Sequence, residues 1–148
     1  MLKFISSKQK KEITKKLESQ YQIKELKINY RFLKDTKDKI YIINNKISEI
    51  ELKNYKIGTI GLYFGTLNNN DLRLSMEGSF LIGKYAKQNI LELTNAQLKE
   101  WISGKNISTK EELSGFVILK HNKDFLGTGK YKEHIIINHV PKERRTNL

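Results

Sequence analysis

The spacing of hydrophobic residues predicts an amphipathic helix near the beginning of the chain. Within residues 7–20, Ile13 and Leu17 lie about one helical turn apart, and Ser6 or Ser7 can cap the first turn. The rest of the segment is rich in lysine: Lys10, Lys11, Lys15 and Lys16. These lysines can contact a nucleic acid, but a charge run on a short helix more often faces water, and we expect a solvated face.

Alternation of hydrophobic and polar residues predicts strands through the rest of the first half. Residues 25–33 have hydrophobic side chains at every second position: Leu26, Ile28, Tyr30 and Phe32. Further strand-like runs cover residues 39–45, 48–57 and 60–67. The segment LNNND, residues 67–71, is typical of a turn, and we place a domain boundary there.

The second half begins with a short predicted strand at residues 72–74. Ser75 follows it and can cap a helix that begins at Met76. We expect this helix to bury a stripe of hydrophobic residues: Phe80, Leu81, Tyr85 and Ala86. A strand over residues 89–94 comes next.

A second helix is predicted over residues 95–103, with Thr94 or Asn95 as its cap and Gly104 just past its end. Trp101 is the only tryptophan. It shares a side of this helix with Leu98 and Ile102, a spacing that is more typical of a core residue than of a base-stacking platform.

Three strands, over residues 115–122, 124–131 and 134–140, close the pattern. The elements therefore predict an α+β protein with a small N-terminal α/β domain at 1–70. A compact antiparallel barrel with two short helices follows at 71–148.

The composition adds a strong positive charge to this picture. The 148 residues include 28 Lys and Arg against 16 Asp and Glu, which gives a net charge of +12. This excess favours a nucleic-acid partner, although richness in Lys, Ile and Asn could raise the charge without any function. The chain has no cysteine, no secretory leader pattern and no hydrophobic run long enough for a membrane helix. We therefore expect a cytoplasmic protein with no disulfide, no thiolate metal site and no membrane partner.

Residues for catalysis are not apparent. The Gly127–Lys130 segment (GTGK) does not fit a phosphate loop, because Asp124 stands where that pattern has glycine and Tyr131 where it has Ser or Thr. A tight approach of two strands explains these glycines better. The three histidines lack a helical metal-binding spacing, and the carboxylates are scattered. We expect no enzyme activity, no metal and no cofactor.

The end of the chain concentrates basic and aromatic residues, which suit phosphates and unpaired bases. Pro141 cannot donate a hydrogen bond to a sheet, so we expect it to end the last strand and to project Lys142, Arg144 and Arg145 from a fixed point. Lys130 and Lys132 should form a second, separate basic cluster at the hairpin end. The alternative is that Glu143 and nearby acids tie the arginines down and lock the C-terminus.

Two segments of the second half resemble a known family. They are LRLSMEGSFLIGKYAKQNILELTNAQLKEWISGKNI, residues 72–107, and GFVILKHNKDFLGTGKYKEHIIINHVPKERR, residues 115–145. They resemble the PUA-like RNA-binding domain at the C-terminus of Sun-type ribosomal-RNA cytosine-5 methyltransferases. The chain is similar in particular to small archaeal ribosome biogenesis proteins, in which this domain stands alone behind a short N-terminal domain.

The resemblance implies a PUA-like pseudo-barrel and RNA binding. It does not imply methyl transfer, because those enzymes need cysteine nucleophiles and a Rossmann domain, for which this sequence offers neither the residues nor the length. We predict an RNA site that extends beyond the tail: Lys130, Tyr131, Lys132, Lys142, Arg144, Arg145, Arg73, Lys84 and Lys87.

The predicted function is a non-catalytic ribosome biogenesis or RNA-modification accessory factor. Its expected RNA is an rRNA precursor or tRNA, and its expected protein partner is an RNA methyltransferase or a ribosome assembly factor. Two alternatives remain open. One is an adaptor that docks an RNA-modifying enzyme and touches RNA weakly, and the other is a modified-base reader or enzyme with a pocket in the barrel.

Overall fold

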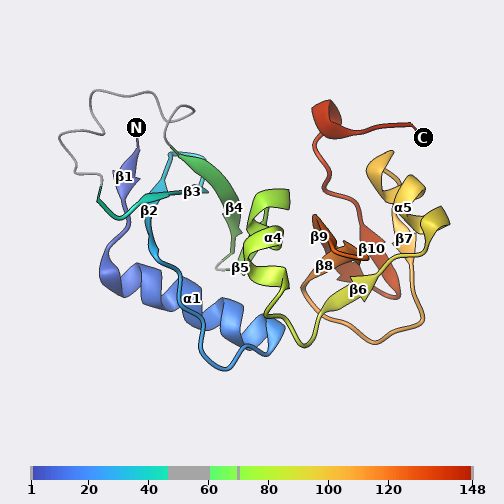
Figure 1. Cartoon of the computed structure of the whole chain (residues 1–148), viewed down its shortest axis with the longest axis horizontal. Helices are drawn as coiled ribbons and strands as arrows, with labels where there is room; N and C mark the ends of the chain where they lie inside the picture. Colours follow the sequence, from blue (N-terminus) through green and yellow to red (C-terminus); the bar gives the residue numbers. More distant parts are fainter. Residues whose placement is uncertain (1, 47–60, 70, 148) are drawn as a thin grey trace.

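Helix α1 (Ser7–Tyr21) begins as its sequence predicts. Ser6 is the N-cap and forms a reciprocal capping box with Gln9. Ile13, Leu17 and Tyr21 are buried. The computed structural model describes residues 2–46, 61–69 and 71–147 (Figure 1).

One lysine of α1 is not solvated as expected. The Lys10 ammonium donates hydrogen bonds of 2.7 and 2.6 Å to the carbonyl oxygens of Ile28 and Tyr30. Partial burial lowers the pKa of Lys10 from its ordinary value. Lys10 therefore fastens the chain that follows α1 to the helix.

The first sheet has the order β1-β2-β3-β4-β5, with every pair antiparallel. Its strands are β1 (Lys3–Phe4), β2 (Tyr30–Lys34), β3 (Lys39–Asn44), β4 (Leu62–Asn68) and β5 (Asp71–Leu74). The strand expected over residues 25–33 starts only at Tyr30, which is 40% exposed, although Leu26 is buried. The strand expected over 48–57 lies outside the described residues.

The segment LNNND does turn the chain, but it does so inside a sheet. β4 and β5 form a hairpin around it, with Asn68 opposite Asp71. The sheet therefore continues across the position where we place the domain boundary, and the division into 1–70 and 71–148 stays a prediction.

The second sheet has the order β6-β8-β9-β10-β7. Its strands are β6 (Ile90–Glu92), β7 (Ile107–Ser108), β8 (Phe116–His121), β9 (Asp124–Lys132) and β10 (Ile135–Ile137). The expected antiparallel arrangement is wrong at one place, because β6 pairs with β8 in parallel. Helix α5 (Asn95–Ile102) begins at a Thr94 capping box and is followed by Gly104 at φ +101°. Two sheets and their helices confirm the α+β class.

Helix α4 (Met76–Gly83) lies between the two sheets and begins at the predicted cap, Ser75 (Figure 1). The hydrophobic stripe predicted for this helix is confirmed at two of its four positions. Leu81 and Ala86 pack against the core, but Phe80 and Tyr85 are exposed.

The buried face of α4 is made mainly of small residues: Gly78, Ser79, Ile82 and Gly83. A side chain on Gly78 would collide with the Phe64 carbonyl oxygen, and one on Gly83 would collide with the Phe125 ring. The helix therefore approaches β4 and β9 too closely for large side chains on that face, which turns Phe80 to solvent.

The core has two clusters, one on each side of the β8–β9 hairpin. The first joins α1, α4 and the first sheet to Ile118, and the second surrounds Trp101. Trp101 is fully buried, as predicted. The register of β8 and β9 shifts between Ile118 and Lys120, and Phe125 and Tyr131 of β9 consequently pack against different clusters.

Candidate nucleic-acid interface

The glycine segment of β9 is one place where the second sheet is joined to α4 and to the first sheet. Gly127 has φ +82°, and its N–H donates to the Ser79 hydroxyl at 2.9 Å. The buried Thr128 hydroxyl donates to the Leu74 carbonyl oxygen at 2.9 Å. These bonds tie β9 to α4 and to β5, so the glycines serve a close backbone approach, as the sequence indicates.

Helix α5 holds the same segment from the other side. The Trp101 indole N–H donates to the Leu126 carbonyl oxygen at 2.8 Å. Residues 126–128 are thus fixed by partners from three separate elements, and they form a rigid floor for the space above them.

A groove of about 410 Å³ opens above this floor. It lies between the first sheet, the start of α4, β9 and the C-terminal segment. Its lining residues are Lys39, Tyr63, Arg73, Leu74, Ser75, Met76, Leu126, Gly127, Thr128, His139, Val140, Pro141, Glu143 and Arg144.

The charges around the groove are mostly positive. Lys39 and Arg73 line it, and Lys130 of β9 lies close enough to act electrostatically on His139. Within the described part of the chain, no ion pair joins Lys39, Arg73 or Lys130 to a carboxylate. Their charges remain available for an anionic ligand.

His139 is a half-buried residue of the groove. Burial lowers the pKa of its imidazole, and the positive charges of Arg73 and Lys130 lower it further. Its Nδ1 is buried without a hydrogen-bond partner among the described residues. Its ring meets Phe116 edge-on at a centroid distance of 6.2 Å, and the Lys130 ammonium lies 4.9 Å from the centroid of the same Phe116 ring. The lowered pKa favours the neutral form of this imidazole.

The end of the chain is tied down more firmly than predicted. Arg144 makes an ion pair with Glu77 at 2.7 Å. Arg145 donates through Nε to the Val140 carbonyl oxygen at 3.1 Å and lies against Gly104. The prediction that both arginines project freely is therefore wrong. The ion-pair alternative holds for Arg144, with Glu77 in place of Glu143.

Pro141 does not end the last strand. β10 stops at Ile137, and the Asn138 side chain then donates to the carbonyl oxygens of Trp101 and Lys105. Pro141 instead precedes a single 3-10 turn, η1 (Lys142–Arg144). Asn138 ends the strand because its amide bonds to the end of α5 in place of a neighbouring strand.

The other residues of the predicted site are dispersed. Lys142 is exposed on η1, whereas Lys84 and Lys87 follow the C-terminal end of α4. Lys130 and Lys132 lie two residues apart on β9, with Lys130 opposite Ile137 and Lys132 opposite Ile135 nearer the hairpin end, so their predicted basic cluster stays a prediction. Tyr131 packs against the second core cluster, and its hydroxyl contacts His134. From the predicted set, Arg73 and Arg144 thus line the groove, and Lys130 lies near His139 of its lining.

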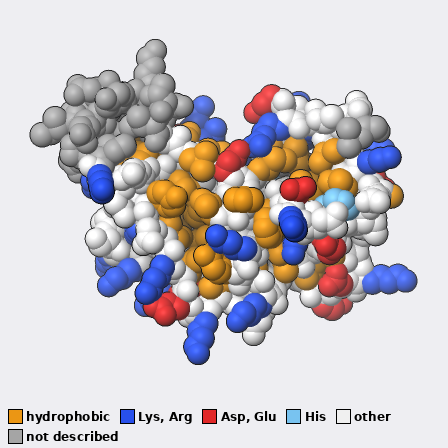
Figure 2. Space-filling view, in the orientation of Figure 1, with side chains coloured by type: hydrophobic (Ala, Val, Ile, Leu, Met, Phe, Trp, Pro, Cys, Tyr) orange, Lys and Arg blue, Asp and Glu red, His pale blue; other side chains and the backbone are white. Residues whose placement is uncertain are grey.

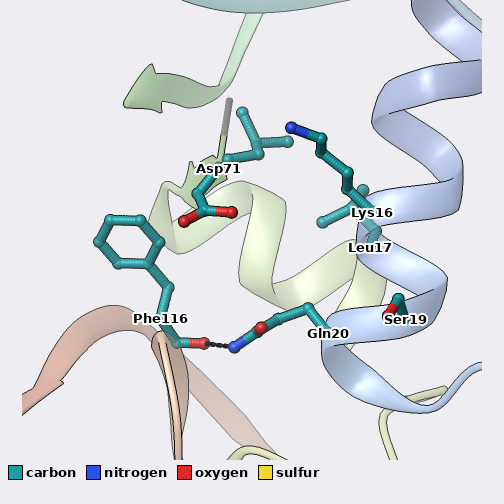
Figure 3. Close-up of a pocket in the computed structure, with 7 residues that line it drawn as sticks. Lys16, Leu17, Ser19, Gln20, Asp71 and Phe116 are labelled. Atoms are coloured by element: carbon teal, nitrogen blue, oxygen red, sulfur yellow. Dashed lines mark hydrogen bonds between the residues drawn. The ribbon is translucent and has the colours of Figure 1, made fainter. Parts of the chain in front are cut away.

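A smaller pocket, of about 160 Å³, lies between α1 and the rest of the protein (Figure 3). Gln20 spans it and donates to the Phe116 carbonyl oxygen at 3.0 Å. The Tyr21 hydroxyl donates to the same oxygen at 2.9 Å, and burial, with the nearby Asp71 carboxylate, raises the pKa of Tyr21. These contacts attach α1 to β8, so this pocket lies at a packing interface within the protein.

Metal-binding groups do not gather within residues 2–46, 61–69 and 71–147: no cluster of three or more His, Asp or Glu is found there. Over the same residues, no helix has the length and hydrophobicity needed to cross a membrane.

Comparisons with known proteins bear on the C-terminal half. Residues 88–146 match the family model of the methyltransferase RsmF PUA domain. The chain is also similar to the ribosomal RNA small subunit methyltransferase F of Aeromonas salmonicida, with 25% identity over 114 residues. This match covers 75% of the chain but only 24% of that enzyme. The chain therefore carries a PUA-like domain of the kind found in Sun-type ribosomal-RNA methyltransferases.

Proposed function

We propose that this protein binds RNA through the basic groove between its two sheets. One observation carries the proposal: Lys39 and Arg73 line the groove, Lys130 lies near His139 of its lining, and these three cations form no ion pair within the described chain. Convergent cations that lack carboxylate partners suit the phosphates of a nucleic acid. The match to a PUA domain of a ribosomal-RNA methyltransferase supports RNA as the ligand.

The groove also suits the other parts of a nucleotide. Tyr63 offers an aromatic ring with the Lys39 ammonium 5.7 Å from its centroid, and the imidazole of His139, a hydrogen-bonding group, also lines the groove. RNA-binding proteins commonly combine phosphate contacts with stacking and with hydrogen bonds to base edges. A groove with these three kinds of group can hold a backbone and position at least one base.

We further propose a non-catalytic role in ribosome biogenesis or RNA modification, with an rRNA precursor or tRNA as the ligand. The matched region of the enzyme from Aeromonas is a quarter of its length, and the family model describes its PUA domain. An RNA methyltransferase or a ribosome assembly factor is the proposed partner, and the proposed location is cytoplasmic. Transcriptome-wide crosslinking of the protein in cells would identify the RNA.

The affinity for RNA is expected to fall steeply with salt. If Lys39, Arg73 and Lys130 each neutralise one phosphate, log affinity should change with log salt concentration at a slope of roughly −2.5. Fluorescence anisotropy with a labelled RNA hairpin measures this slope. A slope near zero, or the absence of binding at low salt, would favour the adaptor alternative.

RNA binding is also expected to tighten as the pH falls from about 8 to about 6. In the free protein the pKa of His139 is lowered by burial, by Arg73 and by Lys130, and a bound phosphate would raise it again. The complex then holds more protons than its components, so acid favours it. Lys39, Glu143 and Arg144 are the other charged groups that line the groove beside His139.

The control is His139→Gln, which should bind RNA with a weaker dependence on pH. The stability of the free protein depends on pH in the opposite direction to the RNA affinity. The unfolded chain binds a proton at His139 more readily than the folded protein, so this group lowers the stability of the free protein as the pH falls from about 6.5 through its lowered pKa. An affinity that depends equally on pH in both proteins would show that His139 does not face the RNA.

A further inference from the structure

Helix α4 and the turn that follows it present aromatic side chains to solvent. Phe80 is 61% exposed and Tyr85 is 49% exposed, the highest values among the large hydrophobic side chains that the structure describes. Figure 2 shows hydrophobic side chains across the middle of this face, around the position of α4, with Lys and Arg side chains among them. A surface of this kind in a soluble protein is typical of a binding site.

Packing holds the exposed ring of Phe80 in place. It meets Phe125 at a centroid distance of 6.3 Å with an interplanar angle of 81°. Phe125 in turn lies directly against Gly83, where any side chain would collide with its ring. An aromatic ring that is already fixed loses little conformational entropy when a ligand stacks on it.

Lysines surround these rings. The Lys84 ammonium lies 5.2 Å from the Tyr85 ring centroid, and the Lys120 ammonium lies 5.7 Å from the Phe125 ring centroid. Lys84 is also four residues after Phe80 and so neighbours it on the outer side of the helix. The one acidic side chain on the same ridge, Glu77, is paired with Arg144. Aromatic rings with adjacent cations are the groups that bind single-stranded nucleic acids.

We propose that Phe80 and Tyr85 are a stacking platform for unpaired RNA bases, with Lys84 and Lys120 on the flanking phosphates. The inference rests on the proposed function and adds the form of the ligand: an RNA with a single-stranded segment beside the part held in the groove.

The geometry of α4 connects the platform to the groove. Ser75 and Met76, at the beginning of the helix, line the groove, whereas Phe80 lies farther along it and Tyr85 lies in the turn that follows its end. Eight residues of helix are about 12 Å long. Three or four stacked nucleotides, at about 3.4 Å each, cover the same length. One RNA strand can therefore contact both sites.

The test compares two fluorescein-labelled probes, an unstructured A-rich RNA of about ten nucleotides and a blunt RNA duplex of equal length. Phe80→Ala and Tyr85→Ala should each weaken binding of the single strand by about fivefold or more, since stacking on an aromatic ring has this effect. Binding of the duplex should change by less than about twofold. Both variants should melt like the wild type, because the side chains are largely exposed. Ile135→Ala, at a side chain of similar exposure on β10, is the matched control and should change neither affinity.

Two conservative variants separate stacking from hydrophobic contact. Phe80→Tyr should retain single-strand affinity, and Phe80→Leu should lose it although it remains hydrophobic. A 2-aminopurine base in the single-stranded probe should be quenched on binding to the wild type and less quenched with Phe80→Ala.

Each other outcome has a definite meaning. If the wild type binds neither probe, the proposed function fails together with this inference. If RNA binds but the Phe80 and Tyr85 variants behave like the wild type, the groove stands and the platform is wrong. If Phe80→Leu binds the single strand as well as the wild type, the patch is a hydrophobic docking surface and the platform is again wrong.

Discussion

Replacing Trp101 with Ala is expected to lower the free energy of unfolding by about 4 kcal/mol. Trp101 is the largest fully buried side chain, and it lies at the centre of the second core cluster, against Gly129. Its indole also donates to the Leu126 carbonyl oxygen, which would lose its partner in the floor of the groove. Urea titration followed by circular dichroism measures the effect, since no other tryptophan is present to report it by fluorescence.

Trp101→Phe separates the two contributions. It keeps most of the aromatic volume but removes the indole N–H, so we expect a smaller loss, about 1 to 3 kcal/mol. RNA affinity of the remaining folded protein should fall as well, because residues 126–128 are then less firmly held. A loss below about 1 kcal/mol for Trp101→Ala would contradict the proposed role of this residue in the core.

Local features of the fold could be predicted from the sequence because their causes are local. Ser6, Ser75 and Thr94 cap their helices because a short hydroxyl side chain can reach the free N–H groups two or three residues ahead. Trp101 was predicted to be buried from its helical spacing alone, and it is.

The buried face of α4 could not be predicted from hydrophobicity. Periodicity selects Phe80 and Tyr85 for burial, but contact with two sheets requires the small residues Gly78, Ser79 and Gly83 on the inner face. How closely two elements approach is a property of the tertiary structure, and a search for large hydrophobic side chains misses it. A signal was nevertheless present, since glycines five residues apart within one helix are unfavourable unless close packing requires them.

The groove was only partly predicted, for a similar reason. Arg73, Lys130 and Arg144 belonged to the predicted site, but Lys39 and His139 were missed because they are separated by a hundred positions. Only the packing of the first sheet against β9 and the C-terminal segment brings them together. The prediction that the C-terminal arginines project freely was wrong because a run of basic residues does not show which acidic residues pair with it. Glu77, which pairs with Arg144, is 67 residues away in the sequence.

Reversing two charges of the groove, with Arg73→Glu and Lys130→Glu together, is expected to weaken RNA binding by about 100-fold or more. Each substitution removes a charged contact to phosphate, and such contacts contribute about 1.5 to 3 kcal/mol each. The new carboxylates also repel the RNA. The slope of log affinity against log salt should become shallower by about 2, because two phosphates are no longer neutralised. Anisotropy titrations at several salt concentrations measure both quantities.

A matched control shows whether location or net charge decides the result. Lys11→Glu with Lys15→Glu changes the net charge by the same amount on the exposed side of α1, away from the groove lining. This control should reduce affinity far less and leave the salt slope nearly unchanged. In the groove variant the pKa of His139 should rise, because the two positive charges that lower it are gone, and an NMR titration of its ring protons would show this. If both double variants lose affinity equally while the pKa of His139 rises in the groove variant, the residues are placed as described but RNA binds elsewhere.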